Sequence, residues 1–396
     1  MIYHLFEYLK AQGFDFPGIG LMQYITVRGI LCAVTAIIIA WAFGSKTISW
    51  LRRKQIGETV RDLGLEGELQ KKGTPTMGGV IIIVSILVPI LLFCDLTNIN
   101  IQLLILTTVW LGALGFADDY IKIFKHNKDG LPAKAKLVAQ IVLGVAVGLT
   151  IYLTSTDVSS YSQTTIPFFK GNEFDYKWLV PGNGPVVRAL QGGLYVLIIT
   201  FIITACSNGT NLADGMDGLT TGICAIVGAT LGILAYVSGH AIFADYLGIM
   251  RLHEAGEVTV YCFAFVGALL GFLWYNCFPA QVFMGDTGSL ALGGIIGVAA
   301  VLIRKELLLP ILCGIFLVES LSVIIQRTYF KHTKKKTGKG VRVFRMSPLH
   351  HHFQKTNPEA LWQHPAKIQP ENRIVVRFWI VSIILAAFTI VTLKIR

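Results

Sequence analysis

The chain has 396 residues, of which 54% are hydrophobic and only 14% are charged, whereas soluble domains carry about 25% charged residues. This composition excludes a soluble globular domain and predicts an all-α integral membrane protein that forms a single domain over residues 1–396. The formal net charge is +11. We expect this charge to face a membrane surface, and we expect no nucleic-acid partner.

Residues 1–24 form the first predicted element. They include Glu7, Lys10 and Asp15, they lack a basic start, and they show no small-residue cleavage pattern, so they do not resemble a cleaved signal peptide. Several aromatic side chains suit the headgroup level of a bilayer. We therefore interpret residues 1–24 as an interfacial segment.

Ten apolar segments follow, and a bilayer core of about 30 Å needs about 20 such residues for each crossing. They predict about ten transmembrane helices, at residues 25–43, 78–94, 101–117, 137–154, 191–206, 219–237, 258–275, 289–303, 307–326 and 374–393.

Lysine and arginine residues are unevenly divided between the two sets of alternate loops. The set that ends with the long basic loop 327–373 holds 24 of them, and the other set holds 10. The positive-inside rule places the richer set in the cytoplasm. The outer loop 155–190 and both chain termini are then expected outside, and the basic face lies beside anionic lipid.

Polar clusters interrupt this apolar pattern at five places, and all five fall on the predicted cytoplasmic face. They are KKGTPTMGG (71–79), GFADDY (115–120), NLADGMDG (211–218), AQVFMGDTGSLALGG (280–294) and RMSPLHHHF (345–353). Clusters placed at random would be divided between both faces. Their common side predicts one active site that is formed by discontinuous cytoplasmic loops.

Each acidic motif has a structural interpretation beside the functional one. Asp118 and Asp119 end an apolar segment and could form an interfacial salt bridge with Lys122. Adjacent carboxylates repel unless a cation or a shared proton relieves them, so the pair also suits a metal or phosphate site. Asp214 and Asp217 could be ordinary turn formers, and their spacing excludes an EF-hand.

Three further features stay open at this point. Asp286 lies between Gly285 and Gly288, which predicts backbone held close to another segment. His350 to His352 cannot all face one way on a helix, so a basic hydrogen-bonding tip is favoured over a zinc site, with a solvated loop as the alternative. Glu319 lies inside the ninth apolar segment, where an acid is either functional or paired with a neighbouring helix.

Acidic loops beside basic loops favour a particular chemistry. Carboxylates bind Mg²⁺, which bridges phosphate oxygens, and lysine or arginine side chains hold the remaining phosphate charge. The phosphate-binding motifs of soluble nucleotide enzymes are absent from the sequence. The pattern therefore predicts transfer of a phosphoryl-containing group to a lipid acceptor.

The five quoted motifs resemble the signature loops of the phospho-N-acetylmuramoyl-pentapeptide-transferase family, within the polyprenyl-phosphate N-acetylhexosamine-1-phosphate transferase superfamily. The similarity runs in the same order from about residue 24 to the carboxyl terminus. Loop 155–190 and the basic stretch 331–340 depart from the family pattern. The resemblance implies a phosphoglycosyl transferase of the bacterial inner membrane. Its substrates would be UDP-N-acetylmuramoyl-pentapeptide and undecaprenyl phosphate, its cofactor Mg²⁺, and its products lipid I and UMP, for peptidoglycan synthesis.

The resemblance also implies roles for individual residues. The expected catalytic residues are Asp118, Asp119, Asp286 and His350, and Asp286 is the expected metal ligand. The expected substrate-binding residues are Lys71, Thr76, Lys134, Asn211, Asp214, Asp217, Asn276, Phe283, Gln326, His351 and His352. Arg342 and Arg345, beside the histidine motif, are expected to meet the anionic donor. Whether Asp118 or Asp119 acts as a base, and whether the protein is a homodimer, stays open.

Three other functions share part of this pattern. A sister transferase that uses UDP-N-acetylglucosamine shares the aspartate motifs, although the PLHHHF loop favours the muramoyl branch. A CDP-alcohol phosphotransferase needs a different sequence after its first aspartate and is excluded. A lipid or solute transporter places polar groups near the bilayer midplane and has inverted repeats, whereas here the polar residues gather at one face.

Overall fold

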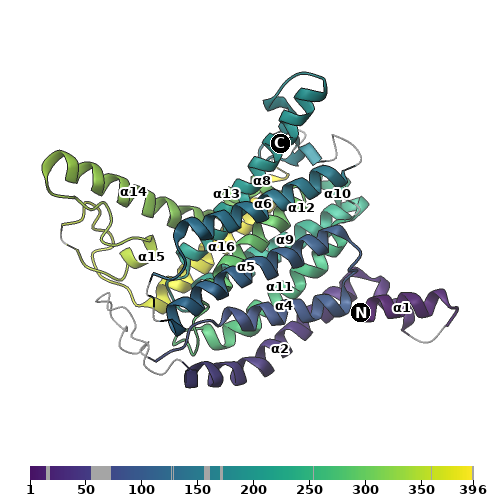
Figure 1. Ribbon diagram of the computed structural model, residues 1–396, viewed down its shortest axis with the longest axis horizontal. Helices are drawn as coiled ribbons and strands as arrows, with labels where there is room; N and C mark the ends of the chain where they lie inside the picture. The colour runs from purple at the N-terminus through teal and green to yellow at the C-terminus, as the bar shows by residue number, and fades with distance from the viewer. Residues whose placement is uncertain are drawn as a thin grey trace.

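The computed structural model describes residues 1–14, 18–54, 73–125, 127, 129–155, 161–169, 173–252, 254–357 and 359–394. This part of the chain is mainly α-helical (Figure 1). The helices are α1 (Ile2–Ala11), α2 (Ile25–Lys54), α4 (Gly79–Phe93), α5 (Ile99–Phe124), α6 (Ala133–Thr154), α8 (Pro185–Ala213), α9 (Leu219–Gly239), α10 (Ala241–Leu247), α11 (Ala255–Asn276), α12 (Gly285–Leu302), α13 (Leu309–Leu312), α14 (Gly314–Thr337), α15 (Leu349–His352) and α16 (Glu371–Thr392). Short 3₁₀ turns lie at Ile19–Gln23, Tyr176–Leu179 and Glu306–Leu308.

The predicted apolar segments coincide with helices, which confirms the all-α membrane class. In the described residues, eight helices are long and apolar enough to cross a bilayer. They are α2, α5, α6, α8, α9, α11, α12 and α16. Helix α4 is shorter, and the ninth segment is a broken pair, Glu306–Leu312 and Gly314–Thr337, bent by 74°. The exact number of crossings stays a prediction.

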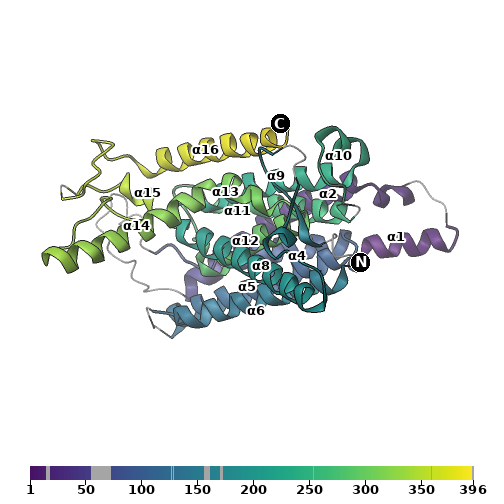
Figure 2. The same ribbon diagram turned by 90° about the horizontal axis from the view of Figure 1, so that it is seen from above.

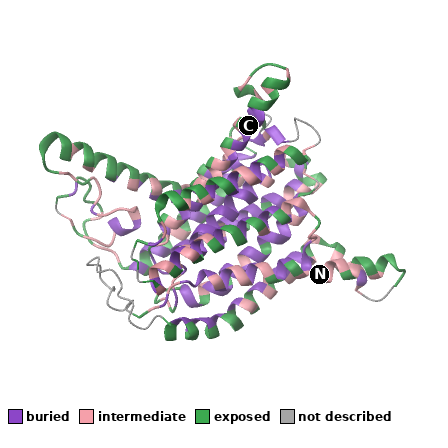
Figure 3. Cartoon of the chain, in the orientation of Figure 1, coloured by how far each residue is buried: buried purple, intermediate pink, exposed green. Residues whose placement is uncertain are grey.

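Helices α11 and α12 form the centre of the bundle. Helix α11 packs against α2, α9 and α4, and α12 packs against α5 and α8. Figure 2 shows α16 and α6 at opposite edges of the bundle, and Figure 3 shows burial concentrated on the central helices. The most apolar stretch of α12 is 83% buried, against 28% for α2 and α16. The outer helices therefore present their remaining apolar faces to lipid.

The start of α12 is held against two other segments by backbone contacts. The amides of Gly78 and Gly79 donate to the carbonyls of Phe283 and Met284, each at 2.8 Å. On α5, a Cβ at Gly115 would lie 2.2 Å from the carbonyl oxygen of Asp286. This approach leaves no room for a side chain at position 115, so glycine there fixes the position of the α12 N-terminus.

The two ends of the bundle carry different elements. Helix α14 projects from one end with α15 beside it, whereas both chain termini lie toward the opposite end (Figure 1). The predicted loop 327–373 is therefore partly helical, since α14 continues to Thr337 and α15 follows. Loop 155–190 contains an antiparallel hairpin, β1 (Gln163–Thr165) and β2 (Glu173–Asp175), in which Thr164 is opposite Phe174.

One ion pair joins α2 to α11 near the amino-terminal helix. Arg28 Nη2 lies 2.6 Å from Glu257 Oε1, and the two side chains are only 4% and 12% exposed. The second oxygen of Glu257 accepts from the backbone amide of Asp95 at 3.0 Å. The Tyr3 ring lies 4.6 Å from the guanidinium carbon, so α1 helps to enclose this pair.

Candidate active site

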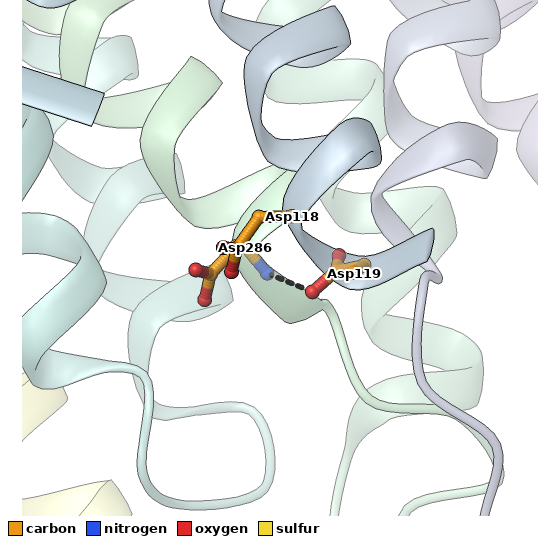
Figure 4. A group of neighbouring side chains, drawn as sticks. All are labelled: Asp118, Asp119 and Asp286. Atoms are coloured by element: carbon orange, nitrogen blue, oxygen red, sulfur yellow. Dashed lines mark hydrogen bonds between the residues drawn. The ribbon is translucent and has the colours of Figure 1, made fainter. Parts of the chain in front are cut away.

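Three carboxylates from two helices converge at the end of the bundle near α15. Asp118 and Asp119 lie in the last turns of α5, and Asp286 lies in the first turn of α12 (Figure 4). One oxygen from each lies within 4.8 Å of the other two. Both aspartates of α5 are buried and Asp286 is half-buried. The close approach at Gly115 brings α5 and α12 near enough for this cluster to form.

Asp119 binds the N-terminus of α12. Its carboxylate accepts from the backbone amides of Asp286 at 3.1 Å and Thr287 at 2.9 Å, and from the Thr287 hydroxyl at 2.6 Å. The first amides of a helix lack partners within the helix, and a negative charge there is stabilising. Asp119 therefore positions Asp286 through the backbone, whereas its predicted catalytic role stays untested.

Two lysine side chains bridge the other two carboxylates. Lys122 Nζ lies 2.5 Å from Asp118 Oδ2 and 3.1 Å from Asp286 Oδ2. Lys136 Nζ, from α6, lies 2.8 Å and 2.7 Å from the same two oxygens. The salt bridge weighed for Lys122 is thus present. Lys134, the lysine expected near phosphate, is exposed, and Lys136 was not singled out from the sequence.

Polar groups of α8 and the following loop complete this side of the cluster. Asn211 donates to Asp286 Oδ1 at 3.0 Å and to the Ser289 hydroxyl at 2.9 Å. Asp214 follows the end of α8. Burial, together with the negative charges of Asp286 and Asp119, raises the pKa of Asp214 to about 8. The raised pKa favours the protonated form of Asp214, which has a hydrogen-bond donor that the carboxylate lacks.

Glu319, which the sequence left unassigned, anchors the histidine helix α15. Its carboxylate accepts from the His350 backbone amide at 3.1 Å and lies 3.2 Å from the His350 ring nitrogen Nδ1. A Cβ at Gly215 would lie 2.3 Å from His350 Nε2 and 3.1 Å from His351 Nε2. The structure thus brings the histidines against the loop that contains Asp214 and Asp217, as one shared site requires.

Several other predicted site residues bind neighbouring protein groups. Asn276 donates to the Val282 carbonyl at 3.0 Å and accepts from Thr221 at 2.6 Å. Asp217 accepts from the Ala280 amide at 3.0 Å. These contacts fix the loop between α11 and α12. Asn276 and Asp217 therefore support the site by holding this loop in place.

Gln326 and His352 hold the segment between α14 and α15. Gln326 accepts from the Val343 and Phe344 amides at 3.0 and 2.9 Å. His352 accepts from the Arg345 amide at 3.1 Å, and its other nitrogen lies 2.6 Å from the His364 carbonyl. Burial lowers the pKa of His352. Both of its ring nitrogens are occupied by protein partners.

The remaining predicted residues occupy different positions. Thr76 and Phe283 are half-buried, and the Phe283 amide donates to the Pro75 carbonyl at 2.8 Å. Lys71 lies outside the described residues. Arg345 is buried and donates to the Gln363 side chain and carbonyl. These bonds use the Nε and Nη2 atoms of Arg345, and its expected contact with the donor stays a prediction.

The chemistry of the cluster follows from its donor set. Three convergent carboxylates offer the oxygen ligands that Mg²⁺ prefers, and the two lysines carry the charge that phosphate groups need. The N-terminus of α12 adds a partial positive charge beside them. The arrangement is suited to binding a divalent cation together with an anionic phosphate ester.

Comparisons with known proteins agree with this geometry. Residues 101–304 match the family model described as glycosyl transferase family 4. Residues 71–83 match phospho-N-acetylmuramoyl-pentapeptide-transferase signature 1. Relatives named phospho-N-acetylmuramoyl-pentapeptide-transferase are 52% identical in Parabacteroides distasonis, 52% in Flavobacterium psychrophilum and 50% in Porphyromonas gingivalis. Each alignment covers 100% of this chain and 100% of the relative.

Proposed function

The chain belongs to the phospho-N-acetylmuramoyl-pentapeptide-transferase family, and from that premise we propose that it catalyses the reaction for which the family is named. It transfers phospho-N-acetylmuramoyl-pentapeptide from UDP to undecaprenyl phosphate, and the products are lipid I and UMP. An oxygen of the acceptor phosphate forms a bond to the sugar-linked phosphorus of the donor, and the bond from that phosphorus to UMP breaks. The observation that carries this proposal is the full-length identity of about half to relatives with this name.

We propose Mg²⁺ as the cofactor. The convergence of three carboxylates within 4.8 Å fits this ion, with Asp286 as the principal ligand and Asp118 beside it. When bound, Mg²⁺ supplies charge neutralisation for the phosphate oxygens. Asn211 holds Asp286 through its amide, and Asp119 fixes the first turn of α12.

The protein's own residues then act mainly by neutralising charge and by alignment. A phosphate monoester has a second pKa of about 6, so most of the acceptor is already ionised near neutral pH. A general base has little proton to remove. Lys122 and Lys136 are placed to meet phosphate charge, and pre-organised positioning of the attacking oxygen lowers the barrier.

The donor is recognised by the loops around the cluster. Asp214, whose pKa is raised by burial and by neighbouring negative charges, can offer a hydrogen-bond donor in its protonated form. Half-buried Phe283 offers a ring on which a uracil base can stack. His350 and His351, held by Glu319 and against Gly215, face the same loop. These positions support the roles that the family resemblance implies.

The assay that tests the reaction uses purified protein in detergent, undecaprenyl phosphate and each radiolabelled UDP-sugar in turn. We expect label to transfer from UDP-N-acetylmuramoyl-pentapeptide and not from UDP-N-acetylglucosamine. Transfer of N-acetylglucosamine-1-phosphate at a comparable rate assigns the chain to the sister reaction. Absence of transfer from either donor contradicts the proposal.

We further propose that the site faces the cytoplasm of a bacterial inner membrane, with both termini outside. The excess of lysine and arginine on the loops at the site end supports this orientation. Single cysteines at exposed Lys335 and Leu179, on a background without exposed native cysteine, test it with an impermeant thiol reagent. In intact cells only Leu179→Cys should be labelled. If only Lys335→Cys is labelled, the protein has the opposite orientation in the membrane.

A further inference from the structure

Lys122 and Lys136 both contact the same two carboxylate oxygen atoms. Asp118 Oδ2 and Asp286 Oδ2 each lie 2.5 to 3.1 Å from both Lys122 Nζ and Lys136 Nζ. The lysine side chains are 32% and 21% exposed, whereas Asp118 is fully buried. Two ammonium groups thus occupy the positions from which a metal ion would approach these oxygens.

A divalent cation and both ammonium groups cannot share these oxygens in this geometry. Mg²⁺ binds carboxylate oxygen at about 2.1 Å, and a cation there repels the ammonium groups at close range. The other contacts of the cluster can persist, because Asn211 binds Oδ1 of Asp286 and the Leu131 amide binds Oδ1 of Asp118. Only the lysine contacts have to change.

We propose that Lys122 and Lys136 are exchange residues, which hold Asp118 and Asp286 in place without metal and move to the donor pyrophosphate when metal binds. This inference rests on the proposed function. Lysine suits the role because its ammonium group is a compact charge on a flexible four-carbon stem. Without metal, three carboxylates and two ammonium groups leave one net negative charge, so the buried acids are nearly neutralised before substrate arrives.

The alternative is that the lysines only join α5, α6 and α12. The two roles predict opposite changes in metal affinity when a lysine is removed. If the lysines compete with metal, their removal strengthens metal binding and weakens donor binding. If they only support the structure, their removal disorders the carboxylates and weakens both.

The test measures Mn²⁺ binding by electron paramagnetic resonance on purified protein without donor or acceptor. Lys136→Met and Lys122→Met keep the stem and remove the charge. We expect each to lower the Mn²⁺ dissociation constant about tenfold and to raise the donor KM about tenfold in a parallel assay. The matched control is Lys125→Met, an exposed lysine at the end of α5, which should leave the Mn²⁺ dissociation constant unchanged.

Unchanged or weaker Mn²⁺ binding in Lys136→Met, with an unaltered melting temperature, overturns the proposal. If that variant does not fold, Lys136→Arg decides the question. Its retained charge should keep the Mn²⁺ dissociation constant at or above the wild-type value, and a clear decrease contradicts competition. Because metal binding is measured without substrates, tenfold tighter Mn²⁺ binding supports the exchange even if the donor assignment fails.

Discussion

Two buried charge clusters lie at different places in this bundle, and they are built differently. Near the amino-terminal helix, one arginine meets one glutamate, and protein groups enclose the pair. At the other end, three carboxylates converge, and two lysines with partly exposed side chains bridge two of them. The first cluster is balanced and closed, whereas the second has excess negative charge and reaches solvent.

This contrast separates a structural ion pair from a candidate active site in a membrane protein. Burial of charge is common to both clusters, so burial alone does not identify function. Arg28 offers a rigid fork that binds a carboxylate tightly, whereas lysine can exchange partners on a flexible stem. Convergent carboxylates that outnumber their cations keep a net negative charge, which attracts a further cation.

The largest effect is expected from Asp286→Asn. The change removes one negative charge from the proposed metal site, so we expect turnover to fall about a hundred- to a thousandfold while the protein stays folded. Donor turnover and Mn²⁺ binding measure the effect, and both should be lost together. Asp245→Asn, an exposed acid on α10, is the control. Normal turnover of Asp286→Asn, or turnover of the wild type in EDTA, contradicts the metal site.

Substitutions in the closed pair of Arg28 and Glu257 should change the stability of the protein rather than its activity. Glu257→Gln leaves Arg28 buried without its countercharge, which should reduce the free energy of unfolding by about 3–5 kcal/mol. The double variant Arg28→Met/Glu257→Gln should recover part of this loss. Thermal unfolding in detergent measures both, and turnover per folded molecule should stay near the wild-type value. A catalytic defect without loss of stability would mean that this pair is also functional.

The exposed pair of Lys339 and Glu359 provides the control for that comparison. The two side chains are 80% and 72% exposed and lie 3.5 Å apart. Exposed ion pairs contribute little to stability. Lys339→Met should therefore leave the melting temperature unchanged under the same conditions.

A smaller effect is expected from Glu319→Gln, which tests whether this intramembrane acid belongs to the open cluster. The variant weakens the contact to the His350 ring, so the histidines should lose their fixed position and kcat should fall about tenfold. The neighbouring Ser320→Ala is the control, because the Ser320 hydroxyl donates to the Phe316 carbonyl of its own helix. Full activity of Glu319→Gln would show that His350 needs no anchor.

The smallest effect is a pH dependence of the segment between α14 and α15. The pKa of His352 in the folded protein lies below its ordinary value of 6.5. Neutral His352 therefore stabilises the fold at pH values above 6.5, and this contribution is lost as the pH falls through the folded-state pKa. Hydrogen exchange of residues 341–357, corrected for its intrinsic pH dependence, should rise at low pH. In His352→Phe this additional rise should disappear.

The sequence predicted the fold better than the details of the site. Long apolar segments indicate helices because an unsatisfied backbone is costly in lipid, and all ten segments coincide with helices or with the broken pair. The convergence of the five motifs on one end was also predicted, from their positions on alternate loops. The break between α13 and α14 was not predicted, since the composition stays apolar across it.

The assignments within the site depended on contacts that sequence spacing does not encode. Lys134 and Lys136 both begin α6, and only the packing of α6 decides that Lys136 faces Asp118. The partner of Glu319 is His350, 31 positions away. The family resemblance implies substrate binding for His352, but its ring nitrogens bind backbone groups of its own loop. The one signal in the sequence was that Lys136 follows Lys134 by two positions on the same helix. Because these positions face different directions, either lysine could have been the one that meets the carboxylates.

The direct contact between α5 and α12 has a consequence for antibacterial compounds. The carbonyl of Asp286 rests where any side chain at position 115 would be, so the main chain sets the position of this carboxylate. A compound that binds Asp286 would contact a carboxylate whose position the protein can change very little by mutation. Selection for growth in its presence should recover substitutions in the loops around the carboxylate cluster, and position 115 should remain glycine in every survivor.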